Sequence, residues 1–210
     1  MYALFLKGGP IMWPLLLASI TALTVAIERM FFIAAEKLRR SPKTVEAVLL
    51  QVQLGDLSAA IEKGKVSRDP VAKVLVYGLR HEGESISSAL MRAGSRELKR
   101  YDRGLSILDT IITLAPLLGL LGTVTGMIHA FGLLGGQELG TPSAITGGIA
   151  EALIATAFGL GIAITALIPF NYLNAQLERT RHEIEDAATH LELLTWKART
   201  YENSRLFEQA

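Results

Sequence analysis

Long apolar runs alternate with charged stretches along this chain of 210 residues. The first run covers Ile11–Ala35 and is interrupted near its end by Glu28 and Arg29. The second extends from about Leu105 to Leu134, and the third extends from Ile145 to Leu173. Each run is long enough to cross roughly 30 Å of hydrocarbon as an α-helix. The pattern therefore predicts three membrane-spanning helices.

The stretches outside these runs are polar and have a helical pattern. Lys37–Arg103 carries fourteen Lys and Arg and eight Asp and Glu, among short apolar repeats typical of amphipathic helices. After the third run, Leu177, Ile184 and Leu191 recur every seven residues. That spacing predicts an amphipathic helix that continues out of the membrane without a break.

Positive charge predicts the orientation of the spans. The segment after the first span holds fourteen basic residues and the C-terminal tail holds five, whereas the Gly135–Pro142 connection holds none. Basic segments stay in the cytoplasm, so we place both there and the N-terminus outside. The first run exceeds the length of a signal-peptide core and no cleavage pattern follows it, so we expect it to be retained as a span.

Composition excludes several functional classes. The net charge is +1 and there are no cysteines, which gives no general attraction for nucleic acid, no disulfide framework and no thiolate metal site. We find no nucleotide-binding loop, nucleophile elbow, zinc spacing or dinucleotide fingerprint. We therefore expect no enzymatic activity, no metal and no cofactor, and an ion gradient as the energy source.

Small residues recur at helical spacing along the second and third spans. Such stripes let helix backbones approach closely in lipid. Two interpretations stay open: the stripes join the two spans within one chain, or they also line an interface between copies. The stripe of the second span is Ala115, Gly119, Gly122, Gly126 and Ala130, and that of the third is Gly148, Ala152, Ala155, Gly159, Ala163 and Ala166.

Glu151 is the one ionisable residue of the third run. An ionised carboxylate costs several kcal/mol in lipid, so this side chain is expected to face protein or water. A carboxyl group there can hold and release a proton, as a proton relay requires. The alternative is a hydrated or capping residue near the outer interface, because Glu151 lies only six residues into the run.

Threonines accompany this carboxylate. Thr123 lies among the glycines of the second span and Thr156 lies in the third. A threonine can bond the carbonyl three or four residues back, so these two either satisfy their own helices or line a polar path. His129 is expected to be an interfacial residue and not a ligand.

Two segments resemble a known family. Pro116–Gly126 (PLLGLLGTVTG) and Gly148–Ala157 (GIAEALIATA) resemble the paired signatures of the MotA/TolQ/ExbB proton-channel family. The similarity covers both downstream spans and the large polar segment. Phe5–Pro10, together with Ile27–Arg29, looks like an ExbB-type first span, whereas His129–Phe131 looks more like TolQ. The branch, ExbB or TolQ, therefore stays open.

The resemblance implies an assembly and a site. Members of the family form a homopentamer around two copies of a single-span partner of the ExbD, TolR or MotB kind, which brings an essential aspartate. The essential glutamate of the family maps onto Glu151, and its two pore threonines map onto Thr123 and Thr156. The resemblance further implies that the proton motive force across the bacterial inner membrane drives a periplasmic TonB-like or TolA-like protein.

We therefore expect an all-α integral membrane protein with three transmembrane helices and long cytoplasmic helical extensions, assembled as a pentameric ring. The function expected is that of a proton-channel subunit of an inner-membrane motor, serving TonB-dependent transport, envelope integrity or gliding. A structural scaffold without ion flux is the alternative, and a secondary transporter is disfavoured because no inverted repeat is present. The expected segments are 1–36 (N-terminal segment and first span), 37–104 (cytoplasmic helical loop), 105–134 (second span), 135–144 (periplasmic loop), 145–173 (third span) and 174–210 (cytoplasmic helix).

Overall fold

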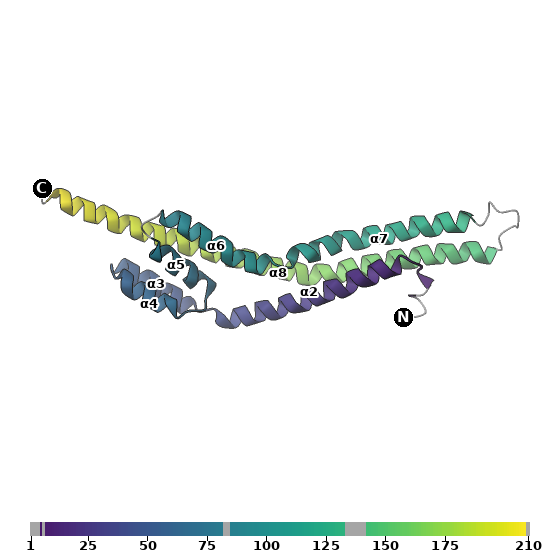
Figure 1. The fold of residues 1–210 in the computed structure, drawn as a ribbon, viewed down its shortest axis with the longest axis horizontal. Helices are drawn as coiled ribbons and strands as arrows, with labels where there is room; N and C mark the ends of the chain where they lie inside the picture. The colour runs from purple at the N-terminus through teal and green to yellow at the C-terminus, as the bar shows by residue number, and fades with distance from the viewer. Residues whose placement is uncertain (1–4, 6, 82–84, 133–141, 209–210) are drawn as a thin grey trace. The chain divides into compact units, whose positions relative to one another are not determined.

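The computed structural model describes residues 5, 7–81, 85–132 and 142–208, and the side chains of these except 142–145 and 199–208. The regular elements within these residues are helices (Figure 1), as the all-α prediction requires. They are α2 (Met12–Arg39), α3 (Pro42–Gln53), α4 (Leu57–Lys65), α5 (Pro70–Arg80), α6 (Ile86–Asp102), α7 (Leu105–Gly132) and α8 (Pro142–Glu208). Most of the expected periplasmic loop, residues 135–144, lies outside the described residues.

The chain divides into two compact units. The membrane unit comprises Met1–Met30 and Gly104–Leu173, and the polar unit comprises Phe31–Arg103 and Asn174–Ala210. Three helices, α2, α7 and α8, are long and apolar enough to cross a membrane, which confirms the three predicted apolar helices. The α8 helix contributes to both units and continues without interruption to Glu208, as its seven-residue pattern predicts.

The membrane unit exposes most of its large apolar side chains. Leu17, Leu23, Leu117, Ile128 and Ile168 are all more than half exposed, although they are strongly hydrophobic. Large apolar surfaces of this kind are unfavourable in water and are natural in lipid. What the unit buries is mainly small. Where α7 and α8 face each other, the buried residues are alanines and glycines, so the two helices lie close together.

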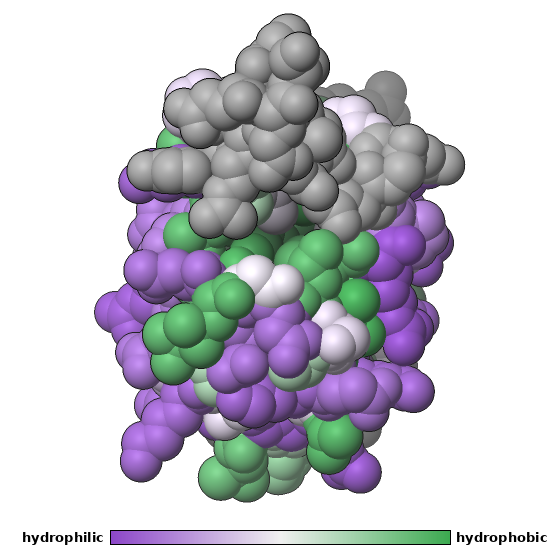
Figure 2. All heavy atoms as spheres, turned by 90° about the vertical axis from the view of Figure 1, so that its left-hand side faces the viewer, coloured by the Kyte–Doolittle hydropathy of each residue, from purple (hydrophilic) through white to green (hydrophobic). Residues whose placement is uncertain are grey.

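The polar unit has an ordinary apolar core. The α5 helix supplies much of it and is buried on most of its surface. The seven-residue pattern of α8 adds Ile184, Ala187 and Leu191 to the same core. Its other members come from α3, α4, α5 and α6: Val48, Val52, Ala60, Val71, Val74, Leu75, Leu79, Leu90 and Ala93. The surface of this unit that faces the viewer in Figure 2 is mainly hydrophilic, with scattered apolar patches.

Aspartates begin two helices of the polar unit. Asp56 accepts a hydrogen bond from the Ala59 backbone N–H at 2.8 Å, and Asp69 accepts one from the Val71 N–H at 2.8 Å. These bonds satisfy donors that the first turn of a helix leaves without an intrahelical partner. The bond from Ala59 also lowers the pKa of Asp56 below its ordinary value. Pro70, whose fixed φ suits the first turn, follows Asp69.

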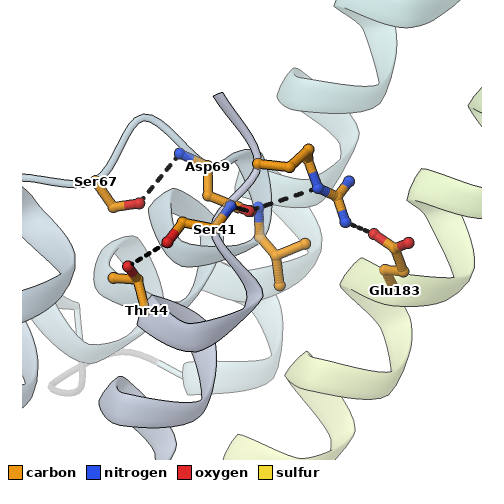
Figure 3. Close-up of polar contacts among 7 residues, drawn as sticks. Ser41, Thr44, Ser67, Asp69 and Glu183 are labelled. Atoms are coloured by element: carbon orange, nitrogen blue, oxygen red, sulfur yellow. Dashed lines mark hydrogen bonds and ion pairs between the residues drawn. The ribbon is translucent and has the colours of Figure 1, made fainter. Parts of the chain in front are cut away.

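Asp69 ties three segments of the polar unit together (Figure 3). Its carboxylate is fully buried and accepts a hydrogen bond from the Ser41 backbone N–H at 2.6 Å. The same oxygen lies 3.5 Å from Nε of Arg40, and Arg40 also pairs with Glu183 on α8. One buried carboxylate thereby holds the link between α2 and α3, the start of α5 and, through Arg40, the middle of α8.

A second buried polar cluster lies at the end of α2. Glu36 is 2 % exposed and its carboxylate lies 3.6 Å from the guanidinium of Arg39 and 4.0 Å from that of Arg100. Tyr101 is buried beside it, with its ring 5.5 Å from the Phe32 ring in an edge-on arrangement. Burial raises the pKa of the Tyr101 hydroxyl, and the negative charge of Glu36 raises this pKa further.

Candidate functional site

The small residues of α7 and α8 lie against each other within the membrane unit. A Cβ built on Gly159 would stand 2.5 Å from the carbonyl oxygen of Ala115, and one on Gly119 would stand 3.0 Å from Cα of Thr156. Further toward the other end of the pair, a Cβ on Gly148 would stand 2.8 Å from Cβ of Ala130. Backbone therefore packs on backbone over this contact, which leaves no room for larger side chains.

The same contact continues between these two ends. A Cβ on Gly122 would stand 2.5 Å from Cβ of Ala155, and a Cβ on Gly126 would stand 2.9 Å from Cβ of Ala152. The two helices run in opposite directions, so early residues of one meet late residues of the other. All six packing residues expected from the sequence, Gly119, Gly122, Gly126, Gly148, Ala155 and Gly159, lie in this α7–α8 contact.

Thr156 also belongs to the contact between α7 and α8. Its hydroxyl donates to the Gly119 carbonyl oxygen on α7 at 2.8 Å, and the side chain is half-buried. This bond joins two helices, unlike the usual bond of a helical threonine to its own preceding turn. Thr123 follows the usual pattern, because its hydroxyl donates to the Leu120 carbonyl oxygen of α7 at 2.6 Å.

Glu151 lies on a different side of α8. Thr156 is five residues further along, which is about 140° around an α-helix. The Glu151 side chain is half-buried and lies against Gly9, in the turn that leads into α2. A Cβ on Gly9 would stand only 1.8 Å from Oε1 of Glu151. Among the described residues, the Glu151 carboxylate has no hydrogen bond or ion pair.

The structure therefore brings Thr156 to α7 and Glu151 to the turn before α2, and it leaves Thr123 bonded to its own helix. Within the part of the chain that the structure describes, no hydrogen bond joins Glu151 to either threonine. The same part contains no group of three or more His, Asp and Glu side chains placed to hold a metal ion. What the site offers chemically is one half-buried carboxyl group on an apolar helix.

Comparison with known proteins identifies the family of the chain. Residues 66–186 match the family model described as the MotA/TolQ/ExbB proton channel family. The chain belongs to this family. The match includes α7, the apolar part of α8 with Glu151, and the second half of the polar unit before α7.

Relatives of two branches are similar to the chain. A Synechocystis sp. protein named ExbB-like 1 is 39 % identical over 90 % of this chain and 77 % of its own length. The biopolymer transport protein ExbB of Neisseria gonorrhoeae is 31 % identical over 67 % of this chain and 73 % of its own length. The Tol-Pal system protein TolQ of Haemophilus influenzae is 40 % identical over 45 % of this chain and 43 % of its own length. This ExbB/TolQ-like chain is thus a multi-pass membrane protein of a proton-channel family.

The contact between Gly9 and Glu151 was missed by reasoning from the sequence of this ExbB/TolQ-like protein. The segment Phe5–Pro10 contributed to the resemblance, but nothing in the order of residues links it to a side chain about 140 positions away. Two adjacent glycines before a proline do signal a tight turn at the start of a helix. Which residue such a turn covers depends on how α2 packs on α8, and local pattern does not contain this information.

Proposed function

We propose that this chain is the channel-forming subunit of a proton-driven motor in the bacterial inner membrane, with Glu151 as its proton-exchanging group and Thr123 and Thr156 as the polar residues of the path. The proposal depends on one observation: Glu151 is a half-buried carboxyl group in a long apolar helix, with no hydrogen bond or ion pair among the described residues. Lipid strongly disfavours an unpaired carboxylate, so this group is expected to bind a proton or a polar group of another chain.

The proposed assembly is a pentamer of this chain around two copies of a single-span partner of the ExbD or TolR kind. An aspartate of the partner takes up a proton from the periplasmic side and passes the Glu151 carboxyls of successive subunits. A charged aspartate and a neutral one have different solvation costs in the ring, so protonation changes the preferred position of the partner. The partner then steps or rotates and transmits work to a TonB-like or TolA-like protein.

The proposed orientation places the polar unit in the cytoplasm and the N-terminus in the periplasm. The support is the basic segment 37–103 and the basic C-terminal tail, which contrast with a connection between the second and third spans without Lys or Arg. The N-terminal turn beside Glu151 then lies at the periplasmic side, where the proposed path begins.

A scaffold without ion flux is the competing function. In a scaffold, Glu151 would serve to pair with a neighbouring polar group and hold helices together. The α7–α8 contact, however, consists of glycines, alanines and the Thr156 bond, and Glu151 takes no part in it. The helices therefore pack without the carboxylate, which favours the motor over the scaffold.

Proton flux into liposomes tests the proposal. The chain is reconstituted with and without its single-span partner, and a pH-sensitive dye inside the vesicles reports the flux. We expect Glu151→Gln to abolish the partner-dependent flux, because an amide keeps the shape and does not release a proton. The matched control is Glu62→Gln, a surface carboxylate 73 % exposed on α4. Flux of Glu151→Gln at the wild-type level, with normal expression and assembly, would refute the motor and favour the scaffold.

A further inference from the structure

The N-terminal turn before α2 has a defined structure. Gly8 N–H donates to the Phe5 carbonyl oxygen at 3.1 Å, and Met12 N–H donates to that of Gly9 at 3.2 Å. Gly9 has φ +72°, a backbone conformation that glycine adopts readily and that strains residues with a Cβ. Gly8 is buried. The turn is therefore hydrogen-bonded at both ends and requires glycine at its centre.

This turn contacts α8 at two points of one face. A Cβ on Gly9 would stand 1.8 Å from Oε1, 2.8 Å from Cδ and 3.2 Å from Cγ of Glu151. A Cβ on Gly8 would stand 3.1 Å from Cγ2 of Ile154. Glu151 and Ile154 are three residues apart, so they lie on the same side of the helix. The turn thus covers one side of the Glu151 side chain along most of its length.

We infer that Gly9 is a positioning residue for Glu151: the missing side chain lets the turn cover one side of the carboxyl group, and the turn restricts where this group can point. The inference rests on the proposed function of Glu151 and extends it. Because the turn occupies one side, the carboxyl group exchanges its proton on the remaining side, where the partner helix would pass. Restricting an exchanging group to one geometry is worth a large rate factor.

Gly55 is a control that separates the effect of a positive φ from the effect of a close neighbour. Gly55, in the link between α3 and α4, has φ +82° and nothing within 4 Å of a built Cβ. Its backbone alone requires glycine there. Gly9 has the same backbone requirement and, in addition, a carboxylate where its Cβ would stand. Gly55→Ala is therefore the matched control for the strain that a positive φ causes.

The first experiment compares Gly9→Ala with Gly55→Ala. In liposomes containing the partner, we expect Gly9→Ala to lower proton flux by about tenfold to a hundredfold and to shift its pH profile, since a displacement of reacting groups by about 1 Å costs up to about a hundredfold in rate. Reaction of Glu151 with a carbodiimide, followed by mass spectrometry, should become severalfold faster as the carboxyl group is pushed from the turn. Gly55→Ala should behave as wild type in all three measurements. Reaction of Glu151 in Gly9→Ala at the wild-type rate would overturn the inference.

The second experiment keeps Gly9 and Glu151 intact and needs no flux. The chain has no cysteine, so the pair Gly8→Cys with Ile154→Cys can be oxidised without competing thiols. We expect a disulfide in this pair and none in Gly8→Cys with Gly161→Cys, because Gly161 is about 10 Å further along α8. Equal and low bridging in both pairs would overturn the inference.

The two experiments also separate this inference from the proposed function. If the wild-type complex conducts no protons while the 8–154 pair forms its disulfide and Gly9→Ala changes the carbodiimide reaction, the motor fails and the positioning contact stands. If the wild-type complex conducts and the contact tests fail, the motor stands and Gly9 has no role in placing Glu151.

Discussion

Glu151 and Thr156 show how different the surroundings of two neighbouring residues on one helix can be. The Thr156 hydroxyl bonds the Gly119 carbonyl of α7, whereas Glu151 faces the turn at Gly9. Within the described part of the chain, the Glu151 carboxyl group has no polar partner. In the proposed motor that partner comes from another chain, which is why the decisive experiments on Glu151 use the assembled complex.

Tyr101 is the residue whose titration the structure predicts most directly. Its pKa is raised above the ordinary 10.0 by burial and by the charge of Glu36, so the folded chain holds this proton when the unfolded chain has lost it. Its effect on stability is therefore absent below about pH 10, and stability falls as pH rises through that value and above it.

We expect Tyr101→Phe to make thermal stability less sensitive to alkaline pH than the wild type, measured by circular dichroism. Tyr172→Phe, a change at an exposed ring in the membrane unit, is the control and should keep the wild-type sensitivity. We also expect Glu36→Gln to lower the pKa of Tyr101, followed by tyrosinate absorbance. An unchanged pKa in Glu36→Gln would contradict the electrostatic role of Glu36.

At the scale of elements, the α7–α8 pair depends on close backbone contact and not on interlocking large side chains. Its two stripes meet from Gly148 near one end to Gly159 near the other. In lipid there is no hydrophobic drive to bring two apolar helices together, so contact area and short-range attraction decide their association. A single added methyl group in this contact therefore has a large effect.

Gly159→Ala and Gly161→Ala form a matched pair that tests this contact. The new Cβ at 159 would stand 2.5 Å from the Ala115 carbonyl oxygen, a backbone atom that has no freedom to rotate away, so α7 and α8 must separate. The Cβ at 161 meets nothing within 4 Å. We expect a lower unfolding temperature for Gly159→Ala, and for Gly161→Ala a neutral result or a gain of up to about 1 kcal/mol in helix stability. Equal thermal unfolding of the two variants would contradict the contact.

The whole molecule combines two units that differ in which side chains they expose and bury. The membrane unit exposes apolar side chains and buries small ones, while the polar unit encloses an apolar core. Two helices, α2 and α8, belong partly to each unit. Glu151 therefore lies on the same continuous helix as Ile184 and Leu191, which belong to the apolar core of the polar unit.

Labelling of introduced cysteines tests the proposed orientation. We expect Lys7→Cys to react with a membrane-impermeant maleimide in intact spheroplasts, because the N-terminus is proposed to be periplasmic. Gln53→Cys, at an exposed position of α3, should react only after the membrane is opened. The chain has no other cysteine, so each signal has one source. The reverse pattern of labelling would invert the proposed topology.

Period and composition were enough to predict the three long apolar helices and the uninterrupted α8, while the resemblance of two segments, Pro116–Gly126 and Gly148–Ala157, pointed to the family. The reason is that helix type and membrane preference depend on residues close together in the chain. The repeat of Leu177, Ile184 and Leu191, for instance, marks one apolar face of α8 by its spacing alone. Ile184 and Leu191 on that face lie in the apolar core of the polar unit. The motif around Glu151 likewise identified the candidate carboxyl group before any contact was known.

Tertiary structure alone decided which groups meet across the sequence. Three contacts join residues that are distant in the sequence. Thr156 donates a hydrogen bond to Gly119, the Ser41 backbone N–H donates one to the buried Asp69, and Gly9 packs against Glu151. Such contacts depend on how helices rotate and slide against each other, and these two freedoms are set by the packing of whole helix faces. A local pattern states which face is small or apolar, and only the packed helices determine what that face touches.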